Sequence, residues 1–190
     1  MYAKYHTDAL VLGSIERGEA DRFYTLYTKE LGLVKARASA VRRESSRMRY
    51  ALMHYATASI SLVRGTRGWR VAGATARGGD WGTPTGLAAF ARVVQLVIRL
   101  VPEEEKNESL FSILTEARRA FAQESCDNGA TIELLCVART LHALGYLSVE
   151  SVSVALFSST VFALPDMAEA EARREALLLS VNRALSETQL

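Results

Sequence analysis

The sequence has no long hydrophobic run and only two cysteines. No stretch of its 190 residues approaches the ~18 apolar residues that a membrane-spanning helix needs. The opening segment, MYAKYHTDAL, lacks the continuous apolar core of a signal peptide. Cys126 and Cys136 cannot supply a disulfide framework, and a reducing compartment is the simplest setting for them. These absences predict a cytoplasmic protein.

The sequence also lacks the motifs of nucleotide-dependent and nucleophilic enzymes. No G-x-x-x-x-G-K-[ST], G-x-S-x-G or G-x-G-x-x-G occurs. His6, His54 and His142 are scattered, with no cysteine or aspartate at metal-ligand spacing. Glu19 and Asp21 could be paired carboxylates, but no third ligand lies nearby, so capping or pairing with an arginine is the favoured interpretation. We therefore expect no catalytic residue, no metal and no cofactor.

Charge is divided unevenly along the chain. Residues 1–80 hold fourteen Lys/Arg against seven Asp/Glu, a net +7, whereas residues 81–190 hold nine against fourteen, a net −5. A basic module beside an acidic one suggests two tasks. The glycine-rich segment Arg77–Thr85 reads as a linker between them. The sequence thus predicts two domains, residues 1–80 and 81–190.

Alternating apolar residues predict five strands in the basic half. Gly32 can take the positive φ of a tight turn between two of them, and Gly13 suggests a bulge in the first. A short helix is expected at Ser45–Met53, between the third strand and the fourth. The expected strands are Thr7–Ile15, 21–28, Leu33–Val41, Tyr55–Arg64 and Trp69–Ala76. Five strands with a helix in this place are the element order of an OB-fold barrel.

Apolar residues recur at helical spacing along the acidic half. Apolar stripes predict helices over 87–101 and 110–121, the second introduced by the acidic run Glu103–Glu105 and by Asn107, and further helices over 132–144 and 166–185. Residues 149–164 fit a strand or a helix equally. The predicted fold class is therefore α+β with two domains: an N-terminal OB-fold β-barrel followed by an all-α helical domain.

Cations gather in one part of the predicted barrel. Alternation over Leu33–Val41 places Lys35 and Arg37 on one face and small residues on the core face. A loop crowded with arginine follows, and the second hairpin carries three more. The candidate DNA-binding residues are Lys35, Arg37, Arg42, Arg43, Arg47, Arg49, Arg64, Arg67 and Arg70. Such a surface suits a polyanion, although a loop that merely keeps the domain soluble and ordinary hairpin-turn charge are the alternatives.

Aromatic side chains could stack on unpaired bases. Tyr24, Tyr50, Tyr55 and Trp69 are the candidates, whereas Phe23 and Tyr27 are expected in the core.

These residues resemble a known family. The string GEADRFYTLYTKELG, the following strand with its Arg/Ser-rich loop, the segment YATASISLVRGTRGWRVAGA and the helix end LHALGYL are similar to the RecO family of bacterial recombination mediators. The resemblance implies a non-enzymatic, nucleoid-associated protein that binds single- and double-stranded DNA, anneals complementary strands and helps load the RecA recombinase. It also implies two protein partners, RecR and the C-terminal tail of single-strand-binding protein.

The sequence departs from that family in one respect. Many members carry a four-cysteine zinc-binding insertion after the segment that LHALGYL matches, and no cysteine lies beyond Cys136 here, so we transfer no metal site. The acidic tail of a partner would need an apolar pocket and a cation. The candidate cations are Arg92, Arg99, Arg118, Arg119 and Arg139. The competing hypothesis is an adaptor whose barrel binds protein or structured RNA, since OB folds serve many functions.

Overall fold

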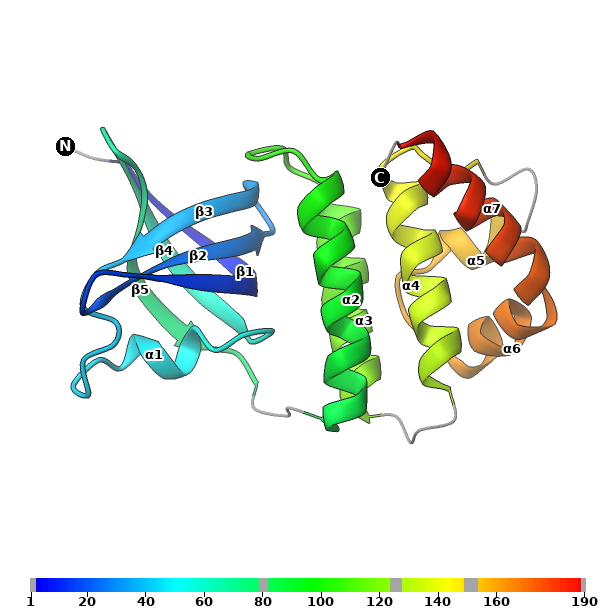
Figure 1. The fold of residues 1–190 in the computed structure, drawn as a ribbon, viewed down its shortest axis with the longest axis horizontal. Coiled ribbons are helices and arrows are strands. Elements are labelled where there is room, and N and C mark those ends of the chain that lie inside the picture. The colour runs from blue at the N-terminus through cyan, green and yellow to red at the C-terminus, as the bar shows by residue number, and fades with distance from the viewer. Residues whose placement is uncertain (1–2, 79–81, 124–127, 149–153, 189–190) are drawn as a thin grey trace. The chain divides into compact units, whose positions relative to one another are not determined.

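The computed structural model describes residues 3–78, 82–123, 128–148 and 154–188 (Figure 1). The chain divides into two compact units, which we treat separately. The barrel unit comprises residues 1–80 and 101–111, and the helical unit comprises residues 81–100 and 112–190. The sequence-based boundary between residues 80 and 81 falls outside the described residues and stays a prediction.

The barrel unit contains a closed barrel of five strands. They are β1 Lys4–Arg17, β2 Asp21–Thr28, β3 Gly32–Ala38, β4 Thr57–Gly65 and β5 Gly68–Ala76, and the short helix α1 Met48–Ala51 precedes β4. The strand order is β1-β2-β3-β5-β4, with β3 and β5 parallel and the other pairs antiparallel (Figure 1). The predicted OB-type element order is confirmed, including the register shift at Gly13.

Two-residue alternation builds the barrel core. Val34, Ala36 and Ala38 are buried inside, whereas Lys35 and Arg37 between them are exposed, as the sequence predicts. The third strand is shorter than expected. It ends at Ala38 because the backbone turns at Ala40, whose φ is 55°.

The segment that follows α2 Pro84–Leu100 belongs to the barrel, contrary to expectation. Glu103 forms a parallel bridge with Leu33, which alternation places on the same side of β3 as Lys35 and Arg37, and Leu33 is buried whereas those two are exposed. The prediction that Glu103–Glu105 begin a helix is wrong. Helix α3 spans Glu108–Gln123, and the Asn107 side chain accepts the Leu110 N–H at 2.9 Å near its start.

In the helical unit, α4 packs against most of the other helices. Its bounds are Gly129–Ala143, and it contacts α2, α5 Val154–Ser158, α6 Leu164–Ala172 and α7 Arg174–Glu187. Gly145 follows α4 at φ 80°, the expected left-handed ending. Of the ambiguous stretch, residues 154–158 are helical, while residues 149–153 lie outside the described residues.

The last helix, predicted as one, is two. The backbone departs from helical geometry at Arg173, with φ −109° and ψ 18°. Met167 and Ala170 of α6 and Leu177 and Val181 of α7 are all buried, and both helices contact α4. The four residues are spaced by three, seven and four positions and so fall on one stripe of a continuous helix, which is why the apolar pattern gave no sign of the break. None of the helices within the described ranges is long and apolar enough to cross a membrane.

Candidate nucleic-acid interface

Strand register brings four side chains into one row across the outside of the barrel. Phe23 of β2 pairs with Arg37 of β3, Arg37 pairs with Arg70 of β5, and Arg70 pairs with Val63 of β4. Directly paired residues point to the same face of a sheet. An aromatic ring, two guanidinium groups and an aliphatic side chain therefore adjoin on the solvent side.

This row lies in a concavity that we call the barrel groove. Its volume is about 490 Å³. The lining residues are Phe23, Arg37, Ser39, Val63, Gly65, Thr66, Arg67, Gly68, Trp69 and Arg70. The β4–β5 turn forms one wall and the outer face of β3 the other. OB barrels bind oligonucleotides on this part of the fold. Arginine forks can hold phosphate oxygens here while an aromatic face receives a base.

Asp21 fixes the direction of Arg37. The Arg37 Nε donates to the Asp21 carboxylate at 2.9 Å, and the other carboxylate oxygen accepts the Ala40 N–H at 2.8 Å. The hydrogen bond from Ala40, followed by that from Arg37, holds the pKa of Asp21 below its usual value. The expected role of Asp21 as an arginine partner is confirmed, and it orients one wall of the barrel groove.

The nine candidate cations divide into two sets. In the described part of the chain, Arg43, Arg47, Arg67 and Arg70 are exposed and form no ion pair with an acidic side chain. Two of these, Arg67 and Arg70, line the barrel groove with Arg37. They are the cations most available to a phosphate.

The remaining candidates are already engaged. Lys35 forms an ion pair with Glu103 at 2.6 Å, and Arg42 pairs with Glu16 at 3.4 Å. Arg64 pairs with Glu104 and also lies 4.9 Å from the Trp69 ring centroid. Arg49 lies over the Tyr50 ring at 4.6 Å. The nine cations are therefore not one uniform patch, and DNA contact by each of them stays a prediction.

The aromatic residues are distributed differently from expectation. Tyr24, a stacking candidate, is buried in the barrel core, and Phe23, expected in the core, lines the groove. The Arg17 guanidinium lies 5.4 Å from the Phe23 ring centroid. Tyr27 is buried as predicted, and Trp69 contributes to the groove although it is only 7% exposed.

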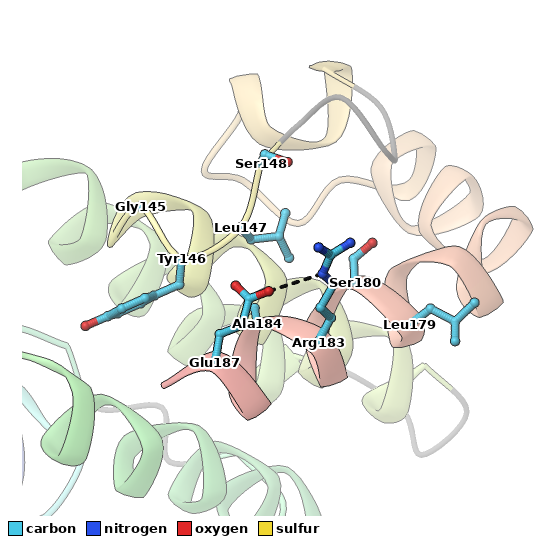
Figure 2. A pocket seen from close by; sticks show the side chains of 9 residues that line it. All are labelled: Gly145, Tyr146, Leu147, Ser148, Leu179, Ser180, Arg183, Ala184 and Glu187. Carbon is cyan, nitrogen blue, oxygen red and sulfur yellow. Dashed lines mark hydrogen bonds and ion pairs between the residues drawn. The ribbon is translucent and has the colours of Figure 1, made fainter. Parts of the chain in front are cut away.

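The helical unit has a hollow of its own, which we call the α7 hollow. Its volume is about 440 Å³. The loop after α4 and one side of α7 line it: Gly145, Tyr146, Leu147, Ser148, Leu179, Ser180, Arg183, Ala184 and Glu187 (Figure 2). Arg183 contacts Glu187 at 3.2 Å across one helical turn, drawn as a dashed line in Figure 2. Sequence reasoning missed Arg183, because an isolated arginine on an amphipathic helix carries no signal of a hollow beside it.

The cations proposed for a partner's tail lie elsewhere. Arg139 is 1% exposed and donates to the carbonyl oxygens of Leu156 and Val161 and to Asp166. Arg92 pairs with Glu133. Arg118 is buried, Arg119 pairs with Glu116, and neither these residues nor Arg99 lines the α7 hollow. Arg139 is therefore a structural residue that joins α4 to α5 and α6.

The described residues hold no group of three His, Cys, Asp or Glu side chains arranged to bind a metal. Cys136 is buried, and burial raises the pKa of its thiol to about 12, so it stays protonated at neutral pH. Cys126 lies outside the described residues.

Known proteins resemble this chain along most of its length. A family model described as "Recombination protein O N terminal" matches residues 1–70. A DNA repair protein RecO from Pelotomaculum thermopropionicum is 33% identical over 159 residues, which are 76% of this chain and 57% of the relative. One from Myxococcus xanthus is 34% identical over 116 residues, covering 58% and 47% of the two chains. One from Geobacter metallireducens is 28% identical over 189 residues, covering 93% and 71%. The chain spans about half the length of the first two relatives. Its first 70 residues thus belong to the RecO N-terminal family, and the chain is similar to DNA repair proteins RecO along most of its length.

Proposed function

We propose that the barrel unit binds single- and double-stranded DNA in the barrel groove and that the chain acts as a recombination mediator without bond chemistry. The observation that carries this proposal is the placement of Arg37, Arg67 and Arg70 beside Phe23 in one concavity. Cations beside an aromatic ring fit a phosphate next to an unpaired base. The family membership supports the same reading.

Strand annealing follows from charge neutralisation. A strand bound along Arg37 and Arg70 loses part of its phosphate charge, and a second strand is then repelled less. Arg43 and Arg47, exposed in the loop after β3, add further positive charge to the barrel unit. Holding two strands near each other in this way promotes annealing through electrostatics alone.

The partners proposed for the helical unit are a RecR-like protein and the C-terminal tail of single-strand-binding protein, with RecA loaded indirectly. Such a tail is apolar and ends in an acid. Leu147, Leu179 and Tyr146 line the α7 hollow together with the cation Arg183, which supports this assignment. The ion pair between Arg183 and Glu187 would have to break before Arg183 could bind the acidic end of the tail.

A strand-annealing assay on complementary oligonucleotides, with and without single-strand-binding protein, tests the mediator function. Binding to single-stranded DNA, duplex DNA and RNA at two salt concentrations tests the ligand. Micromolar or tighter DNA binding that weakens steeply with salt supports the proposal. A preference for structured RNA or for a protein favours the adaptor alternative. The ion pairs of Lys35, Arg42 and Arg64 with acidic side chains leave fewer cations for a phosphate backbone, which supports a protein ligand.

A further inference from the structure

Three consecutive glutamates lie along the edge of β3. We call Glu103–Glu105 the acidic strap. The Glu104 N–H donates to the Leu33 carbonyl oxygen at 2.8 Å, beside the bridge between Leu33 and Glu103. The register between β3 and β5 pairs Ala36 and Arg37, and the strap lies against the part of β3 that precedes them. Backbone contacts therefore hold the strap against β3 independently of the ion pairs that its side chains form.

The strap approaches β3 very closely at Gly32. This residue has φ 68°, and a Cβ atom placed on it would lie 1.9 Å from the Glu105 carbonyl oxygen. Only a glycine fits both that backbone conformation and that contact. The backbone of β3 at Gly32 is thus shaped to allow the close approach of the strap.

The side chains of the strap bind two of the candidate DNA-binding cations. Glu103 pairs with Lys35 at 2.6 Å, and Glu104 pairs with Arg64. Glu104 also accepts the Trp69 Nε1–H at 3.1 Å. The hydrogen bond from Arg64 is the main cause that lowers the pKa of Glu104, so its carboxylate is charged at neutral pH.

The strap and the barrel groove share a residue. Trp69 lines the groove and donates to Glu104, and Arg64 lies over the same ring. Lys35 is two residues from Arg37 on the same outward face of β3. The carboxylates therefore lie where a nucleic-acid backbone leaving the groove would find its next cations.

The strength of these pairs determines what they can do. Lys35 and Glu103 are 58% and 50% exposed, and Arg64 and Glu104 are 52% and 39% exposed. Exposed pairs contribute little to stability, because water competes for both partners. They add little to folding and can be broken by a ligand that carries many negative charges.

We propose that the acidic strap is an autoinhibitory contact in which Glu103 and Glu104 compete with DNA phosphate for Lys35 and Arg64. The inference rests on the proposed DNA binding by the barrel. Carboxylate and phosphate satisfy the same N–H donors, so only one of them can occupy these cations at a time. Bound DNA displaces the two carboxylates while the strap backbone stays on β3. The strap thus lowers affinity and favours strands long enough to reach beyond the groove.

Glu103→Gln, Glu104→Gln and the double substitution test the proposal, because glutamine keeps the shape and an acceptor oxygen for Trp69. Binding of a labelled single-stranded oligonucleotide is followed by fluorescence anisotropy over a range of salt. Each released cation adds about 0.9 to the slope of log K against log salt, which is about an eightfold gain in affinity near 0.1 M salt. The double variant is expected to bind more tightly than either single variant.

Glu105→Gln is the matched control. It removes the same charge from the next residue, which forms no ion pair in the described part of the chain. Its affinity should rise less than that of the other variants. Equal gains in all three single variants would overturn the strap proposal, because they would report net charge alone.

Removal of the cation Lys35 completes the test. Lys35→Ala should change binding little in the natural sequence and should weaken it about eightfold when Glu103 is also Gln. Glu103→Gln alone decides the matter if Glu104→Gln disturbs folding, because the Glu103 side chain pairs with Lys35. Absence of DNA binding by the unaltered chain would refute the proposed function. Intact binding without these gains would refute the strap alone.

Discussion

Arg37 of β3 and Arg70 of β5 are direct partners across the parallel seam of the barrel. Like charges placed opposite each other destabilise a sheet. Asp21 offsets the charge of Arg37, whereas Arg70 forms no ion pair within the described residues. A phosphate bound between the two guanidinium groups would relieve the repulsion, which makes this pair the electrostatic centre of the proposed interface.

Replacing Arg70 by Ala should weaken DNA binding through the loss of one phosphate contact. The slope of log K against log salt should fall by roughly 1, since each neutralised phosphate contributes about 0.9. Titrations of a labelled oligonucleotide at four or more salt concentrations measure this slope.

The control for that substitution is Arg92→Ala in the helical unit, where the arginine already pairs with Glu133. Its slope should match that of the natural sequence. If Arg70→Ala left the slope unchanged too, Arg70 would be removed from the interface. Arg43→Ala, tested in the same way, asks whether the loop beyond β3 contacts a phosphate.

Replacing Phe23 by Ala should weaken binding to single-stranded DNA more than to duplex DNA. The ring lies beside Arg37 in the barrel groove, and a stacked base contributes about 1–3 kcal/mol in single-strand binders. Paired bases are not free to stack, so the ratio of the two affinities is the measurement.

Phe23→Tyr should restore the preference, because it restores an aromatic face. Tyr50→Ala removes another aromatic ring, 60% exposed but outside the groove lining, and should leave the ratio unchanged. An equal loss on both DNA forms after Phe23→Ala would contradict stacking.

Much of the barrel could be predicted from local pattern. Alternation in β3 identified Lys35 and Arg37 as exposed, and the strand count with its helix indicated the OB-type barrel. The faces of β2 could not be assigned in the same way, because apolar residues occupy both. Tyr24 points into the core, whereas Phe23 and Tyr27 share the outer face. Tyr27 is nevertheless buried. Its hydroxyl lies 3.4 Å from the carbonyl oxygen of Asn107, which belongs to residues 101–111, the segment after α2 that joins the barrel unit.

What escaped prediction depends on residues far apart in the sequence. The approach of Arg70 to Arg37 follows from the parallel seam, and the approach of Glu104 to Arg64 spans forty positions. No period or motif encodes either contact. The acidic run before α3 looked like a helix N-terminus, since negative charge favours that position. Its backbone bonds to β3 instead, because the ladder between β3 and β5 begins at Ala36 and leaves the hydrogen-bonding groups of the preceding part of β3 available.

Gly32→Ala should destabilise the barrel unit substantially. Its φ of 68° costs a residue with a side chain about 1–2 kcal/mol, and the new methyl group would overlap the Glu105 carbonyl oxygen. Gly18→Ala is the matched control, since Gly18 has φ 67° and open space around its Cβ position. Chemical denaturation of both variants should show a larger loss for Gly32→Ala. Equal losses would mean that the strap moves aside at no cost.

Arg139→Ala should destabilise the helical unit by about 3–5 kcal/mol, because it leaves Asp166 and two carbonyl groups without their buried partner. Arg119→Ala removes an exposed arginine from a pair with Glu116 and should cost no more than about 1 kcal/mol. Hydrogen exchange of the α4 amides resolves the effect on this unit from that on the barrel. Unchanged protection in Arg139→Ala would contradict a structural role.

Asp21→Asn should make the stability of the barrel less dependent on acid. The pKa of Asp21 is lowered in the folded protein, first by the Ala40 N–H and then by Arg37. The charged carboxylate therefore stabilises the fold above its unfolded pKa of about 3.9, and this contribution is lost as pH falls through the lower folded value. Asparagine still accepts the Ala40 N–H but carries no charge. The unfolding midpoint of the variant should thus lie below that of the natural sequence at pH 7, and the gap should shrink toward pH 3. Other carboxylates with lowered pKa values are present in both proteins and cancel in the comparison. If the difference between the two unfolding midpoints stayed constant between pH 7 and pH 3, the charge of Asp21 would not stabilise the barrel.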